Sequence, residues 1–193
     1  SSVDFVDGLQ DIRLLLVGKT GHGKSSTANS ILGLKKGHDD SFVEKTSSKS
    51  VTLDVTRKVW IRFGRKIEVV DCPGFCDTFL TEEEIKECLN KIIALTLPGF
   101  SAVGFVLKPD RFTKELIDTV EAFNAFFGNN VQQYAFIILT HTNCEISKDE
   151  YLQDRHEYLD KLRNLCAGNV VFIDNKCDDS TKEKHVGRII EEI

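Results

Sequence analysis

Residues 18–25 place glycines, a lysine and a serine at the spacing of a phosphate-binding loop. They read Gly-Lys-Thr-Gly-His-Gly-Lys-Ser, which fits G-x-x-x-x-G-K-[ST]. Glycines let backbone N–H groups turn towards an anion, and Lys24 can reach the outer phosphates of a nucleotide. The hydroxyl of Ser25 suits Mg²⁺, which prefers oxygen ligands. We expect nucleotide contacts from Lys19, Thr20, Gly21, His22, Gly23, Lys24, Ser25 and Ser26.

A second motif, Asp71-Cys72-Pro73-Gly74, follows an apolar run and is expected at the end of a strand, where ligands bind in parallel sheets. Asp71 suits a water-mediated contact with Mg²⁺. The backbone N–H of Gly74 can meet the γ-phosphate, so loss of that phosphate would release the following segment. The two motifs together predict a loop that senses the third phosphate.

A polar, non-periodic stretch at 37–50 lies between these motifs and predicts a loop. One of its hydroxyls, or one just after it, is expected to complete the metal site. Thr52 is our choice because it lies near the start of a period-two strand pattern. Thr46, Ser48 and Ser50 remain open alternatives.

The segments 140–143 and 172–176 follow two further apolar runs and are expected to hold the base. His141 is predicted to stack on the purine and Asn175 to contact its edge. Guanine presents two adjacent donors, which a carboxylate accepts well, whereas Asn143 offers one oxygen beside a donor amide. Unless another residue compensates, we expect this to weaken selectivity for guanine or to favour a base with a second carbonyl, as in xanthine.

These motifs can form one site only if strands and helices bring them to one edge of a sheet. Short apolar runs alternate with amphipathic stretches, which is typical of a mostly parallel sheet covered on both faces. We predict strands at 12–17, 51–63, 66–70, 102–107, 134–140 and 170–173, and helices at 24–32, 81–97, 113–127, 147–166 and from 181. The fold is therefore predicted to be three-layer α/β, with a six-stranded sheet and one antiparallel edge strand.

Composition supports one globular domain over 1–193, with its core from about residue 11. A formal charge of −5 without a basic stripe argues against nucleic-acid binding. The apolar runs are too short to cross a bilayer, so this chain is expected to be soluble and cytoplasmic. The six cysteines are expected to be reduced, and Cys72 and Cys76 lack the second pair that a zinc site needs.

Several segments together resemble the GIMAP GTPases, the immunity-associated nucleotide-binding family of avirulence-induced-gene type. The similarity covers about residues 11–193 and is carried by 21–26, 29–33, 71–75 and 109–113. Thr140-His141 is also similar to the plastid-import receptor GTPases. The resemblance implies a P-loop NTPase G domain that binds GTP and GDP with Mg²⁺ and forms dimers or oligomers through its nucleotide face. It also implies attachment to the cytosolic face of an organelle membrane, through segments absent from this chain.

Other residues depart from the pattern that the resemblance implies. Cys72 stands where threonine is usual, Asp110 where glycine is usual, and Asn143 where aspartate is usual. Thr20 stands where many small GTPases have glycine, and Phe75 where they carry the glutamine that orients water. We therefore expect slow intrinsic hydrolysis.

Arg111 is a candidate arginine finger supplied across a dimer, where its charge would stabilise the transferring phosphoryl group. The predicted catalytic groups are Lys24, Thr52, Gly74 and Arg111, and the predicted metal-binding groups are Ser25, Thr52 and Asp71. The leading hypothesis is a GTPase switch controlled by assembly. The alternative is a scaffold that binds nucleotide with little turnover, and a small-molecule kinase is disfavoured because the sequence lacks an arginine-rich lid.

Overall fold

The computed structural model describes residues 10–19, 21–35, 37–42, 55–72, 81–96, 99–109, 113–141, 157–167 and 169–193. Five predicted site residues lie outside these ranges: Thr20, Thr52, Gly74, Arg111 and Asn143. So do the alternatives Thr46, Ser48 and Ser50, and the departures Phe75 and Asp110. The roles assigned to them remain predictions.

Six strands form one mixed sheet, as predicted. They are β1 (Ile12–Gly18), β2 (Thr56–Arg62), β3 (Arg65–Asp71), β4 (Ala102–Leu107), β5 (Ala135–Leu139) and β6 (Val170–Phe172). Their order across the sheet is β2-β3-β1-β4-β5-β6. β2 pairs antiparallel with β3 and all other pairs are parallel. The carboxyl ends of β1, β3, β4, β5 and β6 therefore share one edge, where the predicted motifs lie.

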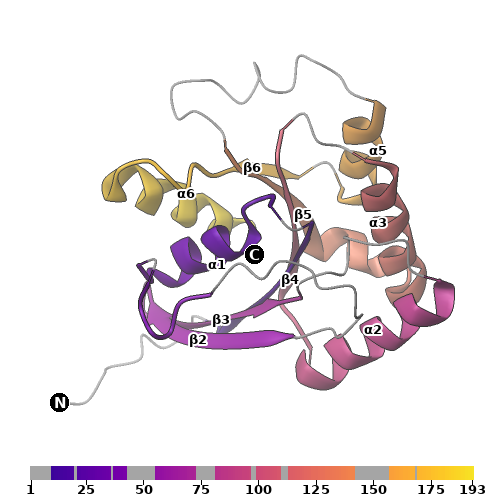
Figure 1. Ribbon diagram of the computed structural model, residues 1–193, viewed down its shortest axis with the longest axis horizontal. Coiled ribbons are helices and arrows are strands. Elements are labelled where there is room, and N and C mark those ends of the chain that lie inside the picture. Colours follow the sequence, from indigo (N-terminus) through magenta and orange to yellow (C-terminus); the bar gives the residue numbers. More distant parts are fainter. Residues whose placement is uncertain are drawn as a thin grey trace.

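Helices cover both faces of the sheet (Figure 1). α1 (Lys24–Leu32) and α6 (Asp179–Glu191) pack on one face, and α2 (Glu82–Thr96), α3 (Lys114–Phe127) and α5 (Glu157–Leu165) pack on the other. β1 lies between the two cores: Leu14 and Leu16 join the cluster under α1, whereas Leu15 and Val17 join the cluster under α3. Because β1 is buried on both faces, it reads as an unbroken apolar run.

Two helix starts show how local hydrogen bonds set the boundaries. The predicted capping box before α2 is present, since Glu84 Oε2 accepts from Thr81 N at 2.7 Å and Thr81 Oγ1 accepts from Glu84 N at 3.3 Å. α6 begins at Asp179 rather than 181, because Asp178 is its N-cap and Asp178 Oδ1 accepts from Thr181 N at 2.9 Å.

The last strands are slightly shorter than predicted. A 3-10 helix, η1 (Asn129–Tyr134), precedes β5, so that strand starts one residue later than the apolar pattern indicates. The helix predicted at 147–166 is described only as α5, because residues 142–156 lie outside the described ranges. Within the part of the chain that is described, no helix is long and apolar enough to cross a membrane.

Cys72, Cys88, Cys166 and Cys177 are free thiols. Burial raises the pKa of Cys88 to about 11 and that of Cys166 to about 12, so both stay protonated at neutral pH. No cluster of three or more potential metal-binding side chains of His, Cys, Asp or Glu occurs among the described residues. Cys76, the partner considered for a zinc site, lies outside them.

Substitution of Gly18 tests how closely β1 and β4 pack. A Cβ at this position would lie 2.5 Å from the backbone oxygen of Val106, which the sheet holds in place. Gly18→Ala should therefore lower the free energy of unfolding by about 1–3 kcal/mol. Gly187→Ala is the matched control, because a Cβ in this α6 position meets nothing within 4 Å, and it should stabilise by about 0.5–1 kcal/mol. Urea unfolding of both variants measures the difference; equal stability would contradict the close packing.

Candidate functional site

The site is built where β1 and β3 end side by side. Leu16 of β1 is in register with Asp71, the last residue of β3, and β1 runs two residues further to Gly18. The loop after Gly18 then leads into α1, whose first residue is Lys24. This places the start of a helix directly above the end of a neighbouring strand, so the two sequence motifs meet.

Lys24 and Asp71 form a buried ion pair at this junction. Lys24 Nζ lies 2.7 Å from Asp71 Oδ1, and both side chains are about 5% exposed. Removing one partner from such a pair leaves an uncompensated charge, which is strongly destabilising. A phosphate oxygen can replace Asp71 as the anion beside Lys24, and the freed carboxylate can then face a hydrated cation. The donor set therefore fits a magnesium nucleotide.

Among the described residues, no side chain caps the amino end of α1. Gly23 is the N-cap residue with a left-handed φ of 88°, and it has no side chain with which to cap the helix. The first turn contains no acidic residue. The N–H groups of the first turn and the positive end of the helix dipole therefore have no side-chain cap from this helix, which is an arrangement that can bind phosphate. Ser25 lies buried in this turn.

The loop after β5 packs against the phosphate loop. Thr140 Oγ1 donates to the backbone oxygen of His22 and lies 2.9 Å from His141 Nδ1. A Cβ on Gly23 would lie 3.3 Å from both Thr140 and the ring of His141, so glycine is needed for this close approach. His141 itself has a left-handed φ of 56°, which is uncommon for a residue with a side chain. The predicted base and phosphate segments are therefore in contact.

The side chain of His22 connects the phosphate loop to the end of β4. It is 3% exposed, and its Nδ1 accepts a hydrogen bond from the backbone N–H of Lys108 at 3.4 Å. The structure therefore places this side chain in the protein interior, where it joins the loop to the end of β4. Its predicted contribution to nucleotide binding can come from its backbone.

Asn175 holds the segment after β6 to α1. Its Nδ2 donates to Thr27 Oγ1 at 3.1 Å, and its Oδ1 accepts from Ser30 Oγ at 2.8 Å. Both ends of the amide are therefore bonded to α1. The contact between Asn175 and the edge of the base remains a prediction, and it requires these bonds to rearrange. The structural role is to fix the segment that follows β6 beside α1.

A buried histidine supports the same segment. His185 Nδ1 accepts from the backbone N–H of Asp174 at 3.2 Å, which requires that nitrogen to be unprotonated. Burial, followed by the nearby charge of Arg188, lowers the pKa of His185, and Asp174 and Asp178 oppose that shift. Neutral His185 is thus part of the folded segment.

Asn29 is a supporting residue whose role the sequence analysis missed. Its Nδ2 donates to the backbone oxygen of Phe42 at 2.9 Å, and its Oδ1 accepts from the backbone N–H of Phe42 at 2.6 Å. It therefore anchors the chain just before the segment that contains Thr52. A buried asparagine inside a helix is unfavourable unless its amide is paired, and this was the signal available in the sequence.

The predicted residues within the described ranges thus fall into two groups. Lys24, Ser25, Asp71, Gly23 and His141 gather at the carboxyl edge of the sheet. Lys19, Gly21 and Ser26 lie along the same loop and first turn, with Gly21 and Ser26 exposed, and Asn175 lies beside α1.

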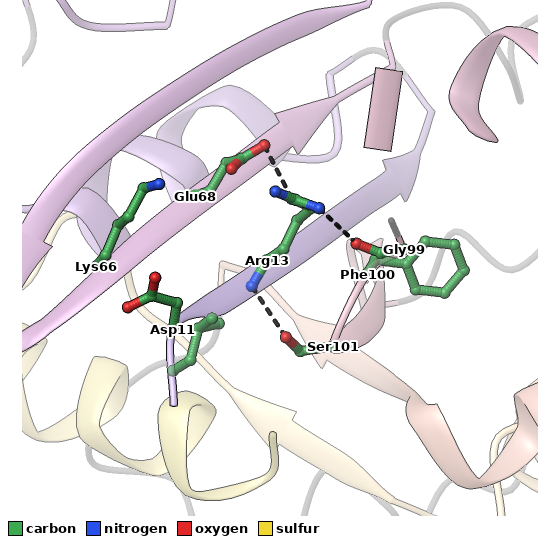
Figure 2. A pocket seen from close by; sticks show the side chains of 8 residues that line it. Asp11, Arg13, Lys66, Glu68, Gly99, Phe100 and Ser101 are labelled. Carbon is green, nitrogen blue, oxygen red and sulfur yellow. Dashed lines mark hydrogen bonds and ion pairs between the residues drawn. The ribbon is translucent and has the colours of Figure 1, made fainter. Parts of the chain in front are cut away.

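A separate concavity lies at the opposite edge of the sheet (Figure 2). It has a volume of about 340 Å³ and is lined by Asp11, Ile12, Arg13, Lys66, Glu68, Gly99, Phe100 and Ser101. Arg13 Nε lies 3.1 Å from Glu68 Oε1, and Arg13 Nη1 donates to the backbone oxygens of Thr96 and Gly99. These bonds join β1 and β3 to the end of α2, so Arg13 supports the fold here.

Comparisons with known proteins agree with this geometry. The model of the AIG1 family matches residues 12–193. Immune-associated nucleotide-binding protein 10 of Arabidopsis thaliana is 33% identical over 177 residues, which are 88% of this chain and 37% of that protein. The chain therefore spans little more than a third of that relative's length.

The fold is also found among solved structures. Toc33 from Arabidopsis thaliana in complex with GDP and Mg²⁺ is similar with a TM-score of 0.67, at 20% identity over 96% of this chain and 83% of that one. A structure of the chloroplast translocon components atToc33 and psToc159, for which dimerization is described as important for GTPase activity, has a TM-score of 0.69 at 21% identity, covering 96% and 82%. These likenesses confirm the predicted three-layer α/β fold of a P-loop G domain.

His185 predicts a pH dependence of stability. Its pKa in the folded protein lies below the ordinary value of 6.5, so the unfolded chain binds the proton more tightly. The free energy of unfolding should therefore be fully retained above pH 6.5 and fall as the pH drops below it. His185→Gln should flatten this part of the profile. Urea unfolding across this pH range measures the slopes; identical slopes for His185→Gln and the parent would contradict the assignment.

Proposed function

The chain belongs to the AIG1 family, and on this premise we propose that it is a switch that binds GTP and GDP with Mg²⁺ and hydrolyses GTP. The observation that carries the proposal is the buried pair of Lys24 and Asp71 at the start of a helix that has glycine as its N-cap residue. The nucleotide-binding relative and the similarity to Toc33 in complex with GDP and Mg²⁺ support it.

Each residue has a role that its chemistry supports. Backbone N–H groups from Lys19 to Ser26 surround the phosphates, and Lys24 moves its ion pair from Asp71 to the outer phosphates. Mg²⁺ would neutralise charge on the phosphates, held by Ser25 and Thr52 and, through water, by Asp71. Gly74 senses the γ-phosphate through its backbone N–H. The exposed ring of His141 lies next to Gly23, at the position from which it can stack on the base.

Hydrolysis is proposed to be slow in the single domain, because Phe75 stands at the position of the water-orienting glutamine. Assembly through the nucleotide face would bring Arg111 of one copy to the phosphates of the other. The dependence of GTPase activity on dimerization that is described for the chloroplast translocon components supports this arrangement. Attachment to the cytosolic face of an organelle membrane and a part in immunity remain predictions from the family.

A scaffold that binds nucleotide with little turnover is the second candidate. Thr20 beside the phosphates and Phe75 in place of glutamine both favour it. Asn143 separately leaves the choice of base open between guanine and xanthine. The rate of phosphate release, rather than affinity, separates a scaffold from a switch.

Substitutions at the ion pair test the binding step. Lys24→Ala should weaken GDP binding by roughly tenfold to a hundredfold, because it removes a charged contact worth about 1.5–3 kcal/mol. Asp71→Asn should leave binding without Mg²⁺ nearly unchanged and abolish the gain that Mg²⁺ gives. Titration of a fluorescent GDP analogue with and without Mg²⁺ measures both effects, with Lys35→Ala as the surface control. Thermal unfolding of each variant shows whether the fold is retained; a folded Lys24→Ala variant with parental affinity would refute the site.

Turnover tests the assembly step. Phosphate release per molecule should rise steeply with protein concentration, and Arg111→Ala should remove that rise without changing GDP affinity. Binding of GDP, ATP and xanthosine diphosphate is measured alongside. Tight guanine binding with no release at any concentration would establish the scaffold instead, and preference for ATP or xanthosine diphosphate would overturn the base assignment.

A further inference from the structure

The β2–β3 hairpin carries most of the exposed large apolar side chains found in the described residues. Val59, Trp60, Ile61 and Phe63 are between 41% and 54% exposed, and Tyr134 is the other such residue in the described part of the chain. All four lie within five consecutive positions at the edge of the sheet (Figure 1). Exposed apolar residues gathered in this way mark a surface that contacts another molecule.

The turn of the hairpin places an aromatic side chain where turn geometry disfavours it. Phe63 and Gly64 have φ values of 53° and 66°, both left-handed, and together they form the two-residue loop between Arg62 and Arg65. Such turns prefer Asn-Gly, because asparagine tolerates this conformation better than a bulky residue. Phe63 therefore adds a conformational cost to the turn while exposing its ring. Backbone strain of this kind indicates that Phe63 serves a function other than stabilising the fold.

The apolar side chains lie on both faces of the hairpin. Trp60 is on the face towards α1, where its ring lies 6.5 Å from that of His38 and the neighbouring Arg62 donates to the backbone oxygen of Ser30. Val59 and Ile61 alternate to the opposite face. A protein that docks on one face would bury only one of these sets. A fluid apolar medium that surrounds the tip can bury both.

The same hairpin is strongly basic. Residues 56–66 contain five cations and no carboxylate, in a chain whose formal charge is −5. Arg57 and Arg62 pair with Glu68 and Glu183. Lys58, Arg65 and Lys66 pair with no carboxylate in the described part of the protein; Lys58 and Arg65 donate to backbone oxygens instead. This charge favours an anionic partner.

We propose that the β2–β3 hairpin is a docking site for an anionic lipid surface, with its apolar residues in the interfacial region and its cations at the headgroups. A second copy of the chain fits less well, because antiparallel pairing of two β2 strands would bring their like charges together. The turn lies at the amino end of β3, opposite the Lys24–Asp71 pair, so a docked domain keeps its nucleotide edge open to other copies. This contact would come from the G domain itself, in addition to any attachment outside this chain.

Trp60 is the single tryptophan of the chain, so its fluorescence reports directly on the hairpin. Vesicles of phosphatidylcholine mixed with phosphatidylserine should shift its emission to shorter wavelength and sediment with the protein. Vesicles of phosphatidylcholine alone should bind the protein more weakly. The loss of affinity should be a factor of up to about five for each cation that reaches the surface. High salt should reduce binding to the mixed vesicles.

Phe63→Asn is the decisive variant, because it supplies the residue that the turn prefers. It should keep or raise the melting temperature and yet reduce vesicle binding by about tenfold, through loss of an inserted apolar ring. Lys66→Glu should also reduce binding to mixed vesicles. Tyr134→Ser is the matched control for the aromatic residue, since Tyr134 is 52% exposed away from the hairpin, and Lys114→Glu on α3 is the control for charge. Both controls should bind as the parent does.

Four results would overturn the proposal. No shift and no sedimentation with mixed vesicles would show that the hairpin does not dock on lipid. A shift that rises with protein concentration in the absence of vesicles would assign the surface to a second copy. A shift with poly-glutamate but not with vesicles would assign it to an acidic polypeptide. Equal binding by Phe63→Asn and the parent would place any lipid contact elsewhere on the chain.

Discussion

The ion pair between Lys24 and Asp71 is the interaction on which the arrangement of the site depends. It joins the first residue of α1 to the last residue of β3, and it is buried, so neither charge can be left alone without a large cost. The pair can be exchanged only for another anion at the lysine and another cation at the aspartate. A nucleotide and a hydrated metal ion satisfy both needs together. The same pair therefore joins α1 to β3 and, under the proposed function, selects the ligand.

Much of this arrangement follows from the sequence because its signals are local. The apolar run of β1, the glycines of the loop and the capping box of α2 each specify backbone conformation over a few residues. Parallel pairing then brings Lys24 and Asp71 together without further information, since the carboxyl ends of such strands share an edge.

What the sequence did not predict depends on partners far apart in the chain. Asn29 bonds to Phe42, Asn175 bonds to Thr27 and Ser30, and His185 accepts from Asp174. The sequence alone does not show whether an asparagine contacts a base or forms hydrogen bonds to a helix of its own chain. Its type indicates that it needs hydrogen bonds, and only the fold shows which partners supply them. The turn at Phe63 differs in kind: the gap between the predicted strands at 51–63 and 66–70 leaves room for a turn, but the strain at the aromatic residue is visible only in its backbone angle.

The contact of Gly23 with Thr140 and His141 also bears on how a bound nucleotide can leave. Thr140 Oγ1 donates to the backbone oxygen of His22, and a Cβ on Gly23 would lie only 3.3 Å from Thr140 and from the ring of His141. The two segments therefore cannot separate without breaking this buried hydrogen bond. If a nucleotide binds here as proposed, its exchange should proceed instead on the side of Asp71. A protein that accelerates exchange would act on that side, by drawing Asp71 away from the site rather than by opening the base segment.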